Sequence, residues 1–244
     1  MNIYLNRISG IEDAIISMYI SKRNWSRELE HDVYTVCSHV LNSRGAVRES
    51  ADICATEEEI KKFNSWISKL TRWGWQHTTL LRFIDFSITV DGLHRAGQDD
   101  WDSHAKRFNN RIIRASTRLA DFSYEMSDWY KGKIIPTDEA LAHMGVRAPN
   151  QIEVDGVKYV RAINGYIRED MADRSDVKRG LYMLSIPSTF IFKVDLTEWA
   201  HVYKERNQNG SANPEVKQCC ERIADEIESM IPAFNRELFM KIKN

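Results

Sequence analysis

The chain has 244 residues, of which 43% are hydrophobic and 28% are charged, a composition typical of a globular protein. Its formal net charge is −1, so no global field would draw it to a polymeric nucleic acid or to an anionic membrane. No apolar run approaches the roughly 18 residues of a membrane-spanning helix, and the N-terminus lacks a signal-peptide pattern. A site for an anionic ligand would therefore depend on local clustering of basic side chains.

The four cysteines are Cys37, Cys54, Cys219 and Cys220. They form no CxxC pair, and no His/Cys spacing indicates zinc. Cys219 and Cys220 are neighbours in the sequence and cannot easily bridge each other. We expect four reduced thiols, as in a cytoplasmic protein, and no metal site.

The first 75 residues are predicted to be helical. Apolar residues recur at helical spacing in 11–22 and in 28–41. Thr56 and Glu59 form a capping box that predicts a helix to about Trp73, and Gly74 would end it.

The period changes in the middle of the chain. Residues 82–90 alternate and are rich in β-branched and aromatic side chains, which predicts a strand. Asp91-Gly92 is predicted to turn the chain. A helix is expected from about Leu93 to Ile113, followed by a strand in 118–126.

Asp155-Gly156 separates two short β-rich segments, 151–154 and 157–160, and predicts a hairpin. A polar stretch to Gly180 is predicted to be helical, and the apolar residues 181–194 are predicted to be β-rich. Helices are expected at 196–205, 214–230 and 233–242. Together these elements predict one α+β domain, residues 1–244, with a helical N-terminal part of about 75 residues.

The C-terminal third carries the most distinctive pattern. Arg179-Gly-Leu-Tyr-Met-Leu-Ser185 is followed by Phe190-Ile-Phe-Lys-Val-Asp-Leu196 and then by Arg206. This run resembles the flavin-dependent thymidylate synthase family, in which Ala-Arg precedes Leu-Pro-Leu-Ser, Trp-x-x-Asn-Leu follows, and Leu-Arg lies one helix later. After one extra residue, Ser211-Ala-Asn-Pro-Glu-Val216 resembles the family's His-Ala-Gln-x-Glu-Ile.

Two upstream segments extend the resemblance. Gly92-Leu-His-Arg95 resembles the family's Gly-x-Ser-Arg at the start of its central helix, and Ser116-Thr-Arg118 resembles the Ser-x-Arg that ends its signature. Counting back from Arg118, the signature's Arg-His-Arg falls on Lys106-Arg107-Phe108, which requires a three-residue insertion after Arg95. If the insertion lies later, Ser103-His104-Ala105 takes that place.

The resemblance implies a mixed or antiparallel sheet flanked by helices. It also implies methylation of a pyrimidine deoxynucleotide at C5, from dUMP to dTMP, by a homotetramer whose sites are shared between subunits. FAD would be the cofactor, with NADPH and methylene-tetrahydrofolate as cosubstrates.

The implied substrate-binding residues are Arg95, Gln98, Ser116, Arg118, Arg179 and Arg206. By the resemblance, Arg118, Arg179 and Ser116 would hold the phosphate, because the planar guanidinium fork meets phosphate bidentately. Arg206 would address the base and is the implied catalytic residue.

The implied flavin-binding residues are His77, Lys106, Arg107, Asp195 and His201. Asp195 stands where the family has asparagine, and a carboxylate lacks the donors of an amide.

The largest departures lie where the family performs its proton and hydride chemistry. Its Gly-His-x-Ser-x-x-Glu-His reads here as Gln76-His-Thr-Thr-Leu-Leu-Arg-Phe83, so that His77 is kept while Arg82 and Phe83 replace the glutamate and the histidine. The acidic residue of the signature falls on Arg114, which reverses the charge. These departures leave two alternatives open: a dUMP or dCMP hydroxymethylase of DNA-modification type, and a nucleotide-binding paralogue without catalysis.

Overall fold

The computed structural model describes residues 1–45, 54–102, 111–116, 126–162, 164–174, 181, 183–208 and 213–242; the side chains of Asp102 and Arg111 are not described. Four implied site residues lie outside these ranges: Lys106, Arg107, Arg118 and Arg179. The strand expected in 118–126 also lies outside them, except for its last residue.

A four-stranded antiparallel sheet forms the centre of the molecule. Its strands are, in spatial order, β1 (Asn2–Ser9), β2 (Asp85–His94), β7 (Pro187–Asp195) and β3 (Arg111–Arg114). Along β7 the side chains of Phe190, Phe192 and Val194 are buried, whereas those of Ile191 and Lys193 are exposed. This period of two is typical of an antiparallel sheet with one face against the core.

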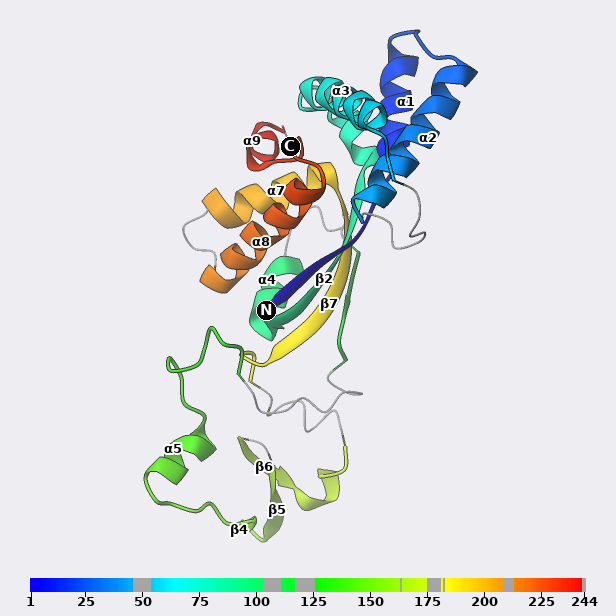
Figure 1. The fold of residues 1–244 in the computed structure, drawn as a ribbon. Coiled ribbons are helices and arrows are strands. Elements are labelled where there is room, and N and C mark those ends of the chain that lie inside the picture. The colour runs from blue at the N-terminus through cyan, green and yellow to red at the C-terminus, as the bar shows by residue number, and fades with distance from the viewer. Residues whose placement is uncertain are drawn as a thin grey trace.

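Helices cover one face of this sheet. They are α4 (Arg95–Asp102), α7 (Leu196–Gln208) and α8 (Pro214–Met230), which contact its strands and one another (Figure 1). Trp101 of α4 packs on the rings of Phe190 and Phe192 and stacks on Trp199 of α7, with 6.2 Å between the indole centroids. All four rings are buried. These contacts fix α4 between the sheet and α7, so that residues at both ends of α4 have defined positions.

The N-terminal helices gather at the end of the sheet where β2 begins (Figure 1). They are α1 (Ile11–Ser21), α2 (Arg27–Ser43), α3 (Glu57–Gly74) and the 3-10 helix η1 (Thr78–Phe83). The predicted capping box of Thr56 and Glu59 is confirmed at the start of α3. Gly10 joins β1 to α1 with a φ of +80°, and a Cβ there would lie 1.8 Å from the carbonyl oxygen of Phe83. Only glycine permits this close approach between two backbone segments.

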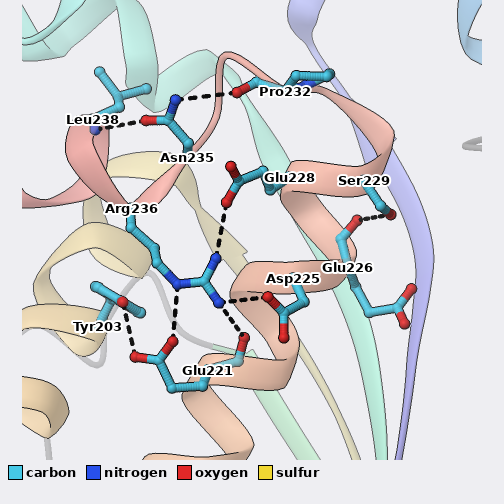
Figure 2. A network of polar contacts seen from close by, with 10 residues as sticks. All are labelled: Tyr203, Glu221, Asp225, Glu226, Glu228, Ser229, Pro232, Asn235, Arg236 and Leu238. Atoms are coloured by element: carbon cyan, nitrogen blue, oxygen red, sulfur yellow. Dashed lines mark hydrogen bonds and ion pairs between the residues drawn. The ribbon is translucent and has the colours of Figure 1, made fainter.

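Arg236 fastens the last helix, α9 (Arg236–Lys241), to α8 (Figure 2). Its guanidinium forms ion pairs of 2.5 to 2.9 Å with three carboxylates of α8, those of Glu221, Asp225 and Glu228. Tyr203 of α7 donates a hydrogen bond of 2.9 Å to one of them, Glu221. One arginine therefore connects α9 to a polar face of α8 that also contacts α7.

A small lobe lies at the opposite end of the molecule from α1–α3 (Figure 1). It contains α5 (Thr137–His143), the 3-10 helix η2 (Glu169–Met171) and an antiparallel sheet of β4 (Gln151–Val154), β5 (Val157–Ala162) and β6 (Gly165–Arg168). The predicted hairpin is confirmed: Asp155 and Gly156 join β4 to β5 with φ values of 53° and 77°, as in a type I′ turn.

The expected fold class, α+β with an antiparallel sheet flanked by helices, is confirmed. Helices α1, α2, α3, α7 and α8 lie where the periodicity predicts them. The expectation of helices throughout the first 75 residues is wrong for Asn2–Ser9, which form the edge strand β1. The polar stretch predicted to be helical contains β6, which pairs with β5. Both strands depend on a neighbouring strand that local spacing does not reveal.

Two further predictions around β2 are wrong. Asp91 and Gly92 do not turn the chain, because β2 continues to His94 with a register shift between Asp91 and Leu93. Gly92 has a φ of 92°, a conformation that glycine adopts readily in a bulge. The helix expected from 93 to 113 is shorter: α4 ends at Asp102, and Arg111–Arg114 form β3, which pairs with β7.

Three of the four thiols, those of Cys37, Cys219 and Cys220, are buried, and Cys54 is exposed. Burial raises the pKa of Cys37 and of Cys219 well above the usual range, so these groups are poor nucleophiles. Across the described ranges, no helix is long and apolar enough to cross a bilayer.

Candidate functional site

Three arginines lie in or against α4: Arg95, Arg114 and Arg206. We call them the arginine cluster. Arg95 is the first residue of α4. Its Nη1 lies 3.3 Å from Oε1 of Gln98 and 3.4 Å from the carbonyl oxygen of Ala115, the residue before Ser116. The structure therefore brings together Arg95, Gln98 and Ser116, which the sequence predicted to bind one substrate.

The other two arginines reach α4 from β3 and from α7. Arg114 donates to the carboxylate of Asp99 at 2.5 Å and to the carbonyl oxygen of Gln98 at 2.9 Å. Arg206 donates to the carbonyl oxygen of Asp100. Arg95 and Asp100 are five positions apart in α4, which corresponds to about 7.5 Å along the helix axis. The contacts of all three arginines therefore fall within two turns of this helix.

The buried side chain of Gln98 forms hydrogen bonds that hold α4 and Arg95 in position. This side chain is fully buried, and its Nε2 donates hydrogen bonds of 3.0 Å to the carbonyl oxygens of Leu93 and Ser188. Both amide hydrogens are thus engaged within the protein, because an amide nitrogen carries only two. Gln98 holds the start of α4 against β7 and presents its oxygen to Arg95.

Two of the residues matched to the family's flavin site, His77 and Asp195, lie at the other end of the sheet. His77 immediately precedes η1, is exposed, and lies 6.0 Å from the ring of Trp73 between centroids. Asp195 is buried at the end of β7, where its Oδ1 accepts hydrogen bonds of 2.9 Å from the backbone of Thr197 and Glu198. Its carboxylate therefore caps the N-terminus of α7, and aspartate serves in this role as well as asparagine does.

The length of β2 separates these two groups of residues. Asp85 and His94 are nine residues apart in one strand, about 30 Å at the usual rise. His77 and Asp195 lie near Asp85, whereas Arg95 follows His94 directly. His201 lies on α7, five residues before Arg206. Within one chain, the implied flavin residues at η1 and the arginine cluster do not share a site.

A buried polar group that the sequence did not predict adjoins the arginine cluster. Glu215, at the start of α8, accepts a hydrogen bond of 2.6 Å from Ser127 and contacts Nδ1 of His94. Burial would raise the pKa of Glu215, but the hydrogen bonds from His94 and Ser127 outweigh that effect and hold it below the ordinary 4.5. Glu215 and His94 each fall in a segment that resembles a family motif, whereas nothing near Ser127 in the sequence signals its role.

Two cavities within the described residues lie away from the arginine cluster. One of about 340 Å³ lies between α3 and α9 and is lined by Arg72, Trp75 and Lys241 among others. The second, of about 280 Å³, lies beside α5 and includes Arg161, which is paired with Asp138. We place the candidate site at the arginine cluster because three guanidinium groups contact α4 there beside Ser116, a residue that the sequence predicted to bind substrate.

This is an α+β protein in which guanidinium groups from three elements contact one short helix, and guanidinium groups are suited to anions such as phosphate esters. The model of the thymidylate synthase complementing protein family matches residues 28–233. The chain belongs to this family, which confirms its resemblance to the flavin-dependent thymidylate synthases.

Two solved structures are similar to this chain over its whole length. Thymidylate Synthase X (ThyX) from Helicobacter pylori with FAD and dUMP has a TM-score of 0.55 and 10% identity, covering 98% of this chain and 100% of the other. The flavin-dependent thymidylate synthase ThyX from the same organism, complexed with FAD and dUMP, has a TM-score of 0.52 and 11% identity, with both chains covered completely. At these identities the similarity shows the fold alone. No curated protein matches the sequence.

Proposed function

We propose that the protein binds dUMP, or a closely related pyrimidine deoxynucleotide, at the arginine cluster and methylates it at C5 to give dTMP. The observation that carries this proposal is the convergence of Arg95, Arg114 and Arg206 on α4, beside Ser116. Family membership supports it, and the solved relatives hold dUMP.

Each member of the site has a proposed task. Ser116 would hold the phosphate together with Arg118 and Arg179, whose guanidinium groups would supply positive charge. Arg95 would assist from the start of α4. Arg206 would address the base, where a fixed cation stabilises negative charge that develops on the pyrimidine ring.

The same proposal includes FAD as cofactor, with NADPH and methylene-tetrahydrofolate as cosubstrates. Trp73 and His77 are exposed before η1, with 6.0 Å between their ring centroids, and Phe83 is exposed at its end. Exposed rings are suited to contact with a flat isoalloxazine ring. His201, Lys106 and Arg107 are proposed to contact the flavin as well. Asp195 would act by capping α7. A bound flavin would supply redox chemistry that no side chain of this protein can provide.

The separation along β2 supports a site shared between copies of this chain, and we propose a homotetramer. The face of the central sheet that α4, α7 and α8 do not cover exposes Tyr4, Ile191 and Ile113, which lie in one cross-strand row. We propose that a second copy covers this row. An Ile113→Lys variant should have a lower molar mass in multi-angle light scattering.

Arg114 favours a second candidate function. At the place of the family's acidic residue, its guanidinium offers donors where a carboxylate would offer acceptors, which suits a different base or product. The alternative is therefore a hydroxymethylase acting on dUMP or dCMP. Incubation of the protein with each nucleotide, methylene-tetrahydrofolate and NADPH distinguishes the two, because the methylated and hydroxymethylated forms of a given nucleotide differ by one oxygen in mass. A protein that binds nucleotide but gives neither product would be a non-catalytic paralogue.

Nucleotide binding is tested by calorimetry with dUMP and dCMP. Arg206→Ala should weaken binding at least tenfold, because the variant loses a charged donor to the ligand. Arg222→Ala is the matched control on α8, since Arg222 is an exposed arginine that donates a hydrogen bond to the carbonyl oxygen of Met1. Undiminished affinity in Arg206→Ala would refute the role of Arg206.

Flavin binding is tested by the colour of the purified protein. A yellow protein whose flavin absorbance bleaches on addition of NADPH would support a flavin-dependent activity. A colourless protein that takes up no FAD during dialysis would exclude it.

A further inference from the structure

Buried polar side chains concentrate at one end of the central sheet. Eight polar or charged side chains are buried within the described residues. Six of them lie where β2 ends, β7 begins and α8 begins: His94, Gln98, Ser127, Ser185, Ser188 and Glu215. Burial of polar groups costs free energy unless they are hydrogen-bonded, so this concentration calls for a functional explanation.

Glu215 is the centre of this group and joins three segments of the chain. Ser127 donates to its Oε1 at 2.6 Å, and Nδ1 of His94 contacts its Oε2. Ser127 also donates its backbone N–H to the carbonyl oxygen of Ser185, at the approach to β7. Both carboxylate oxygens of Glu215 thus have a partner. This side chain, from the first turn of α8, connects the end of β2 with the segment around Ser127.

The hydrogen bonds of Asn213 define the protonation of the His94 ring. Oδ1 of Asn213 accepts the backbone N–H of Glu215 at 2.9 Å, so its Nδ2 faces Nε2 of His94 at 3.5 Å. An amide nitrogen only donates, and Nε2 therefore acts as the acceptor. Nδ1, which faces the carboxylate, carries the proton. This arrangement corresponds to the Nδ1–H form of the imidazole.

The shape of the surroundings holds this ring in place. A Cβ at Gly97 of α4 would lie 2.8 Å from Cε1 of His94, so α4 passes the ring at a distance that only glycine permits. The ring of Tyr130 meets it edge to face, with 4.9 Å between centroids. Rotation of the imidazole would require one of these neighbours to move.

The residue that follows His94 is Arg95. Its backbone N–H donates to the carbonyl oxygen of Ile186 at 3.0 Å, and its guanidinium reaches Gln98 and the carbonyl oxygen before Ser116. We infer that Glu215 is a positioning residue that fixes His94 in its Nδ1–H form and thereby directs Arg95 toward the nucleotide phosphate. This inference rests on the proposed function.

The first test is the tautomer of His94 in the full-length protein. Imidazole ¹⁵N spectra of the wild type should show His94 in the Nδ1–H form, assigned as the signal that is absent from a His94→Gln variant; the signal of His39, whose Nδ1 faces Glu59, should remain. In Glu215→Gln an amide oxygen replaces the carboxylate as the acceptor of Nδ1–H, so the Nδ1 proton resonance should move upfield as that hydrogen bond weakens. Absence of the Nδ1–H signal from the wild type, or an unchanged Nδ1 proton resonance in Glu215→Gln, would overturn the inference.

The second test is a double-mutant cycle for dUMP affinity. Glu215→Gln alone should raise the Kd about tenfold, or about 1.4 kcal/mol, whereas in an Arg95→Ala background it should change the Kd less than twofold. Glu226→Gln on the same helix is the control and should leave the Kd unchanged. An additive cycle would show that Glu215 does not act through Arg95.

Failure of the wild type to bind dUMP would refute the proposed function instead, a result distinct from an additive cycle. If Glu215→Gln unfolds, Ser127→Ala serves as the second variant, because it removes one donor to the same carboxylate. It should raise the Kd two- to fivefold in the presence of Arg95 and not in its absence. Equal effects in both backgrounds would overturn the inference.

Discussion

The guanidinium of Arg114 lies 2.5 Å from the carboxylate of Asp99 and ties β3 to α4. Arg114 occupies the place of an acidic residue in the family's signature, so the sequence by itself suggests a reversed charge. The structure shows that Asp99, four residues after Arg95, supplies a compensating carboxylate.

Asp99→Asn should therefore strengthen nucleotide binding. Removal of this carboxylate leaves the arginine cluster with more net positive charge, and we expect the Kd for dUMP to fall about two- to fivefold at low salt. The gain should vanish near 0.5 M salt because Asp99 is half exposed and its field is screened. Calorimetry at two ionic strengths measures the effect. Asp32→Asn, in α2, removes one carboxylate of another ion pair and is the control.

Gly10→Ala should strongly destabilise the protein. Its methyl group would lie 1.8 Å from the carbonyl oxygen of Phe83, and φ is +80°, so we expect a loss above about 3 kcal/mol. Gly45→Ala separates the cost of the close approach from the cost of the positive φ, because Gly45 has a φ of +72° and no atom within 4 Å of a Cβ. That variant should lose only about 1 kcal/mol. Urea unfolding followed by circular dichroism compares them, and equal losses would contradict the close approach.

Arg236→Ala should lower the free energy of unfolding by about 1–2 kcal/mol. The variant removes three ion pairs, and it leaves Glu221, Asp225 and Glu228 to repel one another on α8. Since salt screens that repulsion, the loss should shrink in 1 M sodium chloride. Arg27→Ala, which removes a single exposed pair with Glu30, should cost less than about 0.5 kcal/mol. A salt-independent loss would point to packing of the arginine stem instead.

The carboxyl of Glu59 should contribute to stability in a defined range of pH. Hydrogen bonds from the backbone N–H of Thr56, from His39 and from the Thr56 hydroxyl lower the pKa of Glu59 from 4.5 to about 2. A lowered pKa in the folded state means that the contribution is complete above pH 4.5 and is lost as the pH falls toward 2. Glu59→Gln should therefore have a lower urea midpoint than the wild type at pH 7, with a difference that narrows between pH 4.5 and pH 2. Glu58→Gln, with an exposed side chain, is the control.

Several elements could be predicted from the sequence because local chemistry defines them. Asn213 caps α8 and Pro214 is its first residue, so the start of that helix is encoded within two positions. The capping box of Thr56 and the Asp155-Gly156 turn are equally local. The family could also be recognised, because short motifs around Arg179 and Arg206 keep their order and spacing.

The remaining features depend on contacts between residues far apart in the chain. Strands β3 and β6 have four residues each, and the longer β1 lies at the edge of the sheet. Pairing with neighbouring strands, and not their own periodicity, stabilises all three. Asp195 could be matched to a flavin contact from its position, but only the turn into α7 reveals it as a helix cap.

The candidate site shows the same division. The sequence by itself determined which residue types were available: arginines at 95 and 206, and a serine at 116. Only the tertiary structure decided that Arg114 joins them and that Glu215 meets His94 and Ser127, which are 121 and 88 residues away along the chain. The reason is physical: a buried carboxylate needs hydrogen-bond donors to offset the loss of water, and the side-chain donors to Glu215 come from segments that folding alone brings together.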